Sequence, residues 1–118
     1  GTFNQNSVYY PDYVILLSEN VSRGEFDKAV LIFGTGIAMS IVANKFPKVR
    51  AALANDLYSS RCSREHTDAN ILVIGGRVVG RELAKEIVKV WLDTAFAGGR
   101  HKRRVEKIEA LEKQNFKK

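Results

Sequence analysis

The sequence predicts an α/β protein with a doubly wound parallel sheet, the Rossmann-like class in which helices cover both faces of the strands. Two observations favour this class. Short unbroken apolar runs alternate with helix-length segments. A glycine-rich turn, Gly34-Thr35-Gly36, directly follows the first apolar run. The 118 residues suffice for one hydrophobic core, so we expect a single three-layer domain spanning residues 1–118.

The first predicted element is a helix over residues 11–23. Pro11 suits a first helical turn, and Gly24 ends the segment. Its apolar side chains recur at helical spacing, at Val14, Leu17 and Val21. Because a doubly wound domain normally begins with a strand, we expect the N-terminal part of this fold to be missing from the sequence.

The later elements alternate in type along the chain. We predict strands over residues 29–33, 49–54 and 70–74, with helices over 37–46 and about 57–66 between them. An amphipathic helix follows over residues 82–92, with an apolar stripe made of Leu83, Ile87, Val90 and Trp91. After a loop, a charged helix runs from about residue 102 to 112.

The loops after the three predicted strands form the candidate site. In open parallel sheets ligands bind beyond the carboxyl ends of the strands. The Gly34 turn, the residues after Ala54 and residues 75–80 all follow strands. Gly34 and Gly36 permit tight backbone geometry, and the helix that follows offers free N–H groups to an anion. A plain strand–helix turn would use the same residues.

A dinucleotide site is one alternative for the glycine turn. Gly34-Thr35-Gly36 begins the dinucleotide fingerprint, and Asp56 stands near the end of the next strand, where a ribose-binding acid is expected. The third glycine position of that fingerprint is Met39, whose bulk conflicts with close helix–strand packing. The pattern therefore favours NAD binding only weakly.

Four further side chains are candidates for acid–base or anion-binding roles. Histidine is a common acid–base residue, which makes His66 a candidate, but the loop that follows it must bring it toward the same rim. Arg100 and Arg104 are four residues apart and share a helix face, while Arg77 follows a glycine pair. Guanidinium groups suit a phosphate monoester. Taken singly, a surface or core histidine explains His66 better, and solvated helix charges explain Arg100 and Arg104 equally well.

Charge and composition exclude several other classes. The net charge is +6, and residues 100–118 hold eight Lys or Arg against three Glu. No aromatic residue interleaves with these charges before Phe116, so we expect no nucleic-acid partner. No apolar run approaches the roughly 20 residues of a membrane span. The single cysteine, Cys62, excludes an internal disulfide and favours the cytoplasm, and the two histidines lack ligand partners for a metal.

Seven stretches in order resemble one family of enzymes. They are YYPDY, GTGIAMSIVANK, VRAAL, SREHTDAN, GGRVVG, ELAKEIVKVWL and GGRHKRRVEKI, and they cover the chain from Tyr10 to Glu112. Together they resemble ribose-5-phosphate isomerase type B and galactose-6-phosphate isomerase. The resemblance implies an aldose–ketose isomerase that forms a cis-enediolate without a metal or organic cofactor. It also implies a homodimer or homotetramer whose active sites are shared between subunits, with a C-terminal helix of about residues 102–113 packed on the partner. It further implies an N-terminal strand with an Asp-His pair upstream of Gly1.

The resemblance also assigns roles to individual residues. It gives His66 the opening of the sugar ring. It assigns stabilisation of the enediolate oxygens to Thr35 and to the amides around Gly34, Gly36 and Ala38. Substrate binding, chiefly of the phosphate, falls to Arg77, Arg100 and Arg104, while Tyr10 and Thr67 line the sugar site.

The sequence departs from the family pattern at several positions. Phe33 occupies the position of the usual cysteine base, and Met39 that of the glutamate used by a second branch. Ala38 replaces a glycine and Thr67 an asparagine. Three hypotheses follow. The chain is an isomerase of ribose 5-phosphate with a different base, a half-site subunit that pairs with a cysteine-bearing relative in a heteromer, or a non-catalytic sugar-phosphate-binding protein.

Overall fold

A computed structural model describes residues 10–116, and within this range the chain forms five helices and three strands. The eight elements are α1 (Tyr10–Ser22), β1 (Ala29–Ile32), α2 (Ile37–Ala43), β2 (Ala51–Leu53), α3 (Leu57–Thr67), β3 (Ile71–Ile74), α4 (Arg81–Asp93) and α5 (Arg100–Asn115). Each lies where the sequence predicts an element of its type. The alternation of strand and helix is therefore confirmed.

The described strands form a parallel sheet in the order β1-β3-β2. Ala29 of β1 and Ala51 of β2 both stand in register with Ile71 of the central strand. Every residue of β3 is buried, whereas Ile32 and Leu53 are exposed at the ends of the two outer strands. Burial on both faces, which an unbroken apolar run predicts for β1 and β2, is wrong for these two outer strands, because each has a neighbour on one side only among the described residues.

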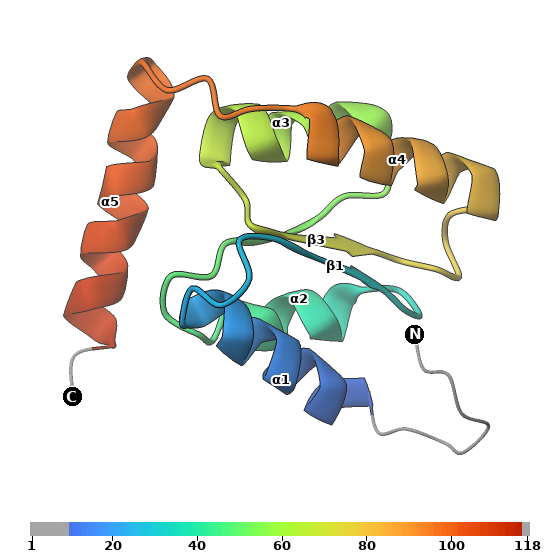
Figure 1. Cartoon of the computed structure of the whole chain (residues 1–118), viewed down its shortest axis with the longest axis horizontal. Coiled ribbons are helices and arrows are strands. Elements are labelled where there is room, and N and C mark those ends of the chain that lie inside the picture. Colours follow the sequence, from blue (N-terminus) through green and yellow to red (C-terminus); the bar gives the residue numbers. More distant parts are fainter. Residues whose placement is uncertain (1–9, 117–118) are drawn as a thin grey trace.

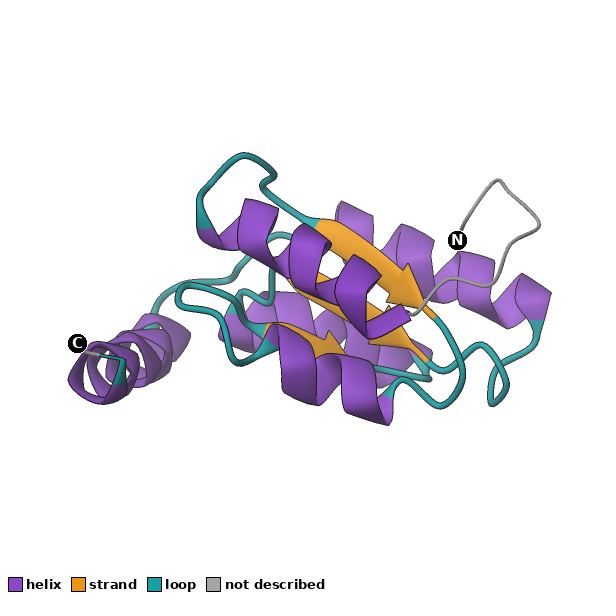
Figure 2. Ribbon diagram, turned by 90° about the horizontal axis from the view of Figure 1, so that it is seen from below, coloured by secondary structure: helices purple, strands orange, loops and turns teal. Residues whose placement is uncertain are grey.

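Helices cover both faces of the sheet, which confirms the three-layer α/β/α class (Figure 1). Helices α1 and α2 pack on one face, and α3 and α4 on the other (Figure 2). The first core contains Val14, Leu31, Met39, Ala43, Ile71 and Val73, and the second Ala54, Leu72, Ile74, Ile87 and Trp91. Side chains of β3 alternate between these two cores, so this strand joins the layers.

Two details of the predicted helices are wrong. Leu83 lies outside the core, because the buried stripe of α4 runs through Ala84, Ile87 and Trp91. Helix α2 ends at Ala43 instead of continuing to residue 46. The side chain of its C-cap residue, Asn44, forms two hydrogen bonds with the backbone of β2. The Asn44 amide nitrogen donates to the Ala51 carbonyl at 3.0 Å, and the Asn44 amide oxygen accepts from the Ala51 N–H at 2.8 Å.

Helix α5 stands apart from the three layers (Figures 1 and 2). It contacts α3 near its first turn, and near its far end the Glu112 carboxylate accepts from the Lys48 N–H at 2.8 Å. Val105 is its buried apolar side chain, whereas Ile108 and Leu111 are exposed. Among residues 10–116, no helix combines the length and the apolar character needed to cross a bilayer.

Candidate active site

The glycine turn after β1 is held tightly against the sheet. Gly34 and Gly36 both have positive φ, +36° and +80°, which side chains other than glycine rarely adopt. A Cβ at position 36 would lie 2.7 Å from Leu53 Cδ1 and 3.0 Å from Val73 Cγ1. The prediction of tight backbone geometry at this turn is confirmed, and position 36 has no room for a larger residue.

Three loops meet at the carboxyl ends of the strands, as the sequence predicts. The Arg77 N–H donates to the Gly34 carbonyl at 2.9 Å, which joins the loop after β3 to the glycine turn. The Gly75 N–H donates to the Asn55 side-chain oxygen at 2.8 Å, which joins it to the loop after β2. A cavity of about 390 Å³ lies at this end of the sheet. Its lining includes six predicted site residues: Phe33, Gly34, Thr35, Gly36, Ala38 and Arg77. We call these six the turn cluster.

Thr35 and the start of α2 supply the polar groups of this cavity. The Thr35 hydroxyl accepts from the Ile37 N–H at 3.3 Å, and the Ser40 N–H donates to the Gly36 carbonyl at 3.0 Å. The N–H groups of the first helical turn have no partner within the helix. Such groups can stabilise negative charge that develops on a nearby oxygen.

Phe33 forms an apolar wall of the same cavity. Its half-buried ring packs against the first core and meets the Tyr13 ring edge-on. A phenyl group transfers no proton, so the position that the family resemblance gives to a base has a packing role here. Met39, at the position of the alternative glutamate, is buried beneath the turn, with 2% of its surface exposed.

A second group of predicted residues gathers where α3 ends and α5 begins. His66, in the last turn of α3, stacks on His101, with ring centroids 4.3 Å apart and an interplanar angle of 15°. The Ala97 N–H donates to the Glu65 carbonyl at 3.1 Å, which ties the segment before α5 to α3. We call His66, Thr67, Arg100, His101 and Arg104 the histidine cluster.

Burial and the neighbouring positive charges of the histidine cluster lower the pKa of His101. Burial lowers the pKa of His101, and the positive charges of His66, Arg100 and Arg104 lower it further, while Glu65 opposes them. The Thr67 hydroxyl donates to the Ser63 carbonyl at 2.6 Å. Arg100 and Arg104 are exposed on the first turns of α5, where their guanidinium groups are available to an anion.

The two clusters lie at opposite ends of the sheet (Figure 1). Helix α3 starts at Leu57, just after β2, and returns the chain to the start of the parallel strand β3. Its eleven residues span about 16 Å at the helical rise. The loop after His66 leads directly into β3, so it does not bring His66 to the glycine turn. The condition under which His66 would join the rim of the strands is therefore not met within a single chain.

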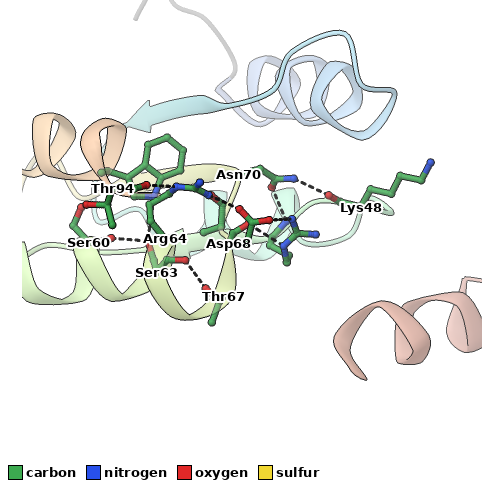
Figure 3. A network of polar contacts seen from close by, with 11 residues as sticks. Lys48, Ser60, Ser63, Arg64, Thr67, Asp68, Asn70 and Thr94 are labelled. Atoms are coloured by element: carbon green, nitrogen blue, oxygen red, sulfur yellow. Dashed lines mark hydrogen bonds and ion pairs between the residues drawn. The ribbon is translucent and has the colours of Figure 1, made fainter. Parts of the chain in front are cut away.

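A buried arginine network fixes the end of α3 (Figure 3). Arg64, only 6% exposed, donates from Nη1 to the Asp68 carboxylate at 2.8 Å and to the Ala69 carbonyl at 2.7 Å, and from Nε to the Thr94 carbonyl at 3.1 Å. Arg50 pairs with the other Asp68 oxygen at 3.5 Å. The network joins α3, β3 and the end of α4, so it holds His66 and Thr67 in place.

Sequence reasoning missed Arg64 and His101. The sequence carries one signal for each: Arg64 lies two residues before His66, and His101 directly follows Arg100.

Tyr10 begins α1, but its side chain lies outside the described part of the structure. Within residues 10–116, no three histidine, cysteine or acidic side chains gather closely enough to hold a metal ion.

The dinucleotide alternative loses its acidic residue in the structure. The Asp56 carboxylate caps α3 by accepting from the Ser59 N–H at 2.7 Å and from the Ser59 hydroxyl at 2.9 Å. The backbone bond, then the hydroxyl bond, lower the pKa of Asp56. This carboxylate is therefore engaged as a helix cap.

Comparison with known proteins agrees with this geometry. The sequence model of a family described as Ribose/Galactose Isomerase matches residues 1–108. Ribose-5-phosphate isomerase B of Escherichia coli is 46% identical over 114 residues, covering 97% of this chain and 76% of the relative. The structure of ribose-5-phosphate isomerase B from Clostridium thermocellum has 50% identity and a TM-score of 0.90, covering 98% of this chain and 78% of that one. The type B enzyme of Trypanosoma cruzi has 48% identity and a TM-score of 0.92, covering 97% and 77%.

Proposed function

The chain belongs to the ribose/galactose isomerase family, and from this premise we propose that it acts in the aldose–ketose isomerisation of ribose 5-phosphate and ribulose 5-phosphate. In this reaction a base removes the proton from C2 of the open-chain aldose, and the electron pair forms a cis-enediolate between C1 and C2. Protonation at C1 then leaves the carbonyl at C2. The reaction has no net redox change and needs no cofactor.

One observation carries the proposal: the six residues of the turn cluster line a single cavity at the carboxyl ends of the strands. Thr35 and the amides around Gly34, Gly36 and Ala38 are placed to stabilise the enediolate oxygens. Arg77 closes the same cavity and supplies positive charge for the substrate.

The remaining roles belong to the histidine cluster. His66 opens the sugar ring, Arg100 and Arg104 bind the phosphate, and Thr67 lines the sugar site together with Tyr10. Because α3 is about 16 Å long and ends at the opposite end of the sheet from the turn cluster, one chain cannot present both clusters to a small sugar phosphate. A homodimer or homotetramer that places the histidine cluster of one copy on the turn cluster of another completes the site.

Helix α5 supports this assembly, because it stands outside the layers and leaves Leu111 59% exposed. We propose that α5, at about residues 102–113, packs on the partner subunit. This contact would bury its apolar side chains and carry Arg100 and Arg104 toward the partner's turn cluster.

Phe33 favours a second candidate function, a half-site subunit or a sugar-phosphate-binding protein. Loss of a positioned base typically lowers the rate about 10²–10⁴-fold. The phosphate-binding arginines do not depend on that base, so binding is retained. A cysteine-bearing relative in a heteromer would supply the missing group.

The two candidates are separated by measuring binding and turnover of ribose 5-phosphate on the same purified protein. Calorimetry gives the dissociation constant, and formation of ribulose 5-phosphate gives the rate, with unphosphorylated ribose as the control and galactose 6-phosphate as the six-carbon comparison. Binding with turnover supports the isomerase, and binding without turnover supports the half-site or binding protein. No binding of either sugar phosphate contradicts both.

A further inference from the structure

The stacked imidazoles of His66 and His101 join two helices that are distant in the sequence. His66 lies in the last turn of α3, His101 lies in the first turn of α5, and the ring centroids are 4.3 Å apart. The Ala97–Glu65 backbone bond holds the connecting segment against α3, so the contact is built into the fold. Only His66 has a role assigned by the family resemblance.

His101 sits in an environment that disfavours its charged form. Its Nδ1 atom is buried and makes no hydrogen bond with any described residue. The groups that act on its ring are Glu65 and His66 from α3, and Arg100 and Arg104 from α5. Burial is the largest cause of its lowered pKa, followed by the positive charge of His66.

We propose that His101 is a positioning residue for His66: a neutral imidazole that fixes the plane of the His66 ring by stacking and lets the pair hold one proton at a time. If both rings were protonated, their positive charges would lie about as close as the ring centroids, which are 4.3 Å apart, and would repel each other strongly. The contact is half-buried, and the charges of Arg100 and Arg104 add to the repulsion. Groups that interact in this way titrate as a pair. The consequence for catalysis rests on the proposed role of His66 in ring opening.

The coupling is testable on the unmodified protein, because the chain contains two histidines. Nuclear magnetic resonance of full-length chain labelled with ¹⁵N-histidine then shows two imidazoles, which His66→Gln and His101→Phe assign. We expect His101 to titrate below its usual pKa, and each ring to show a second inflection where the other titrates. In His66→Gln the pKa of His101 rises, because a neighbouring charge is removed. Two independent single-step curves, with His101 unchanged in His66→Gln, overturn the proposal.

The positioning role is tested by two substitutions at the same residue. His101→Phe keeps a planar ring against His66 but cannot titrate, whereas His101→Ala removes the stack. We expect His101→Ala to weaken ribose 5-phosphate binding about tenfold or more through the misplaced His66. His101→Phe should weaken binding less than His101→Ala and should lose the coupled inflection of His66. Equal affinity in wild type and His101→Ala overturns the positioning role.

The titration is measured without ligand, so it is independent of the proposed function. If ribose 5-phosphate binds none of the proteins while the coupled inflections are present, the proposed function fails and the pairing of the two histidines stands. If ribose 5-phosphate binds and the inflections are absent, the pairing fails and the proposed function stands.

Discussion

The Phe33 ring meets the Tyr13 ring edge-on, with centroids 6.2 Å apart and planes inclined at 67°. This contact joins the end of β1 to α1 at the position where the family resemblance places a proton-transferring base. Edge-to-face aromatic pairs are favourable beyond the apolar area that they bury. Phe33 therefore stabilises the fold at the mouth of a cavity whose chemistry it cannot perform.

Shortening this side chain should destabilise the protein. We expect Phe33→Ala to lower the free energy of unfolding by about 1–3 kcal/mol, less than a fully buried phenylalanine because the ring is half-exposed. Phe33→Leu, which keeps most of the apolar volume, should cost less. Urea unfolding measures both. Equal stability of Phe33→Ala and wild type would show that the ring contributes nothing to packing.

A side chain at position 36 should distort the turn cluster. Gly36→Ala places a Cβ against Leu53 and Val73 at a φ of +80°, so we expect a loss of about 1–3 kcal/mol in stability and weaker ribose 5-phosphate binding. Gly80→Ala is the matched control, because a Cβ there meets nothing within 4 Å and its φ is −68°. If the two variants bind equally well, the geometry of the turn is not part of the site.

The arginines at the start of α5 should bind the phosphate. Charge-assisted hydrogen bonds contribute about 1.5–3 kcal/mol each, so Arg100→Ala and Arg104→Ala should each raise the dissociation constant for ribose 5-phosphate about 10–100-fold. Arg103→Ala is the control, because Arg103 is also exposed on α5 but is not one of the predicted phosphate ligands. An equal effect in all three variants would indicate general attraction to a basic helix.

Acidification should weaken the contact between α3 and α5. The pKa of His101 is lowered in the fold from its usual value of 6.5, chiefly by burial. Its stabilising contribution is therefore fully present above about pH 6.5 and is lost as the pH falls through the lower folded value. We expect the free energy of unfolding to fall between pH 7.5 and 5.5 more steeply in wild type than in His101→Phe. The Asp56 cap should not contribute in this interval, because its pKa lies below 3.8. Parallel pH dependences would contradict this account of His101.

The secondary structure could be predicted from the sequence because its signals are local. Apolar runs and glycine or proline breaks indicate the eight elements without knowledge of the tertiary fold. The exposure of Leu83 and the early end of α2 depend on tertiary partners, in the second case on the bonds between Asn44 and Ala51. Such contacts leave no periodic signal.

The candidate site was predictable in its residues but not in its arrangement. Glycine spacing and the family resemblance identify the turn cluster, which the structure brings together around one cavity. The same resemblance names His66, but the direction of α3 places it at the far end of the sheet. His101 was missed because stacking of two rings from α3 and α5 requires their relative placement.

The central claim is that one sugar-phosphate site combines the turn cluster of one copy with the histidine cluster of another. Arg77→Ala damages the first cluster, and the double variant Arg100→Ala/Arg104→Ala damages the second. If the two variants are unfolded and refolded together as dimers, random mixing gives about a quarter of the sites with both clusters intact. Calorimetric titration of the mixture with ribose 5-phosphate should then recover about that fraction of sites with wild-type affinity. A mixture that binds no better than the two variants measured separately would contradict the shared site.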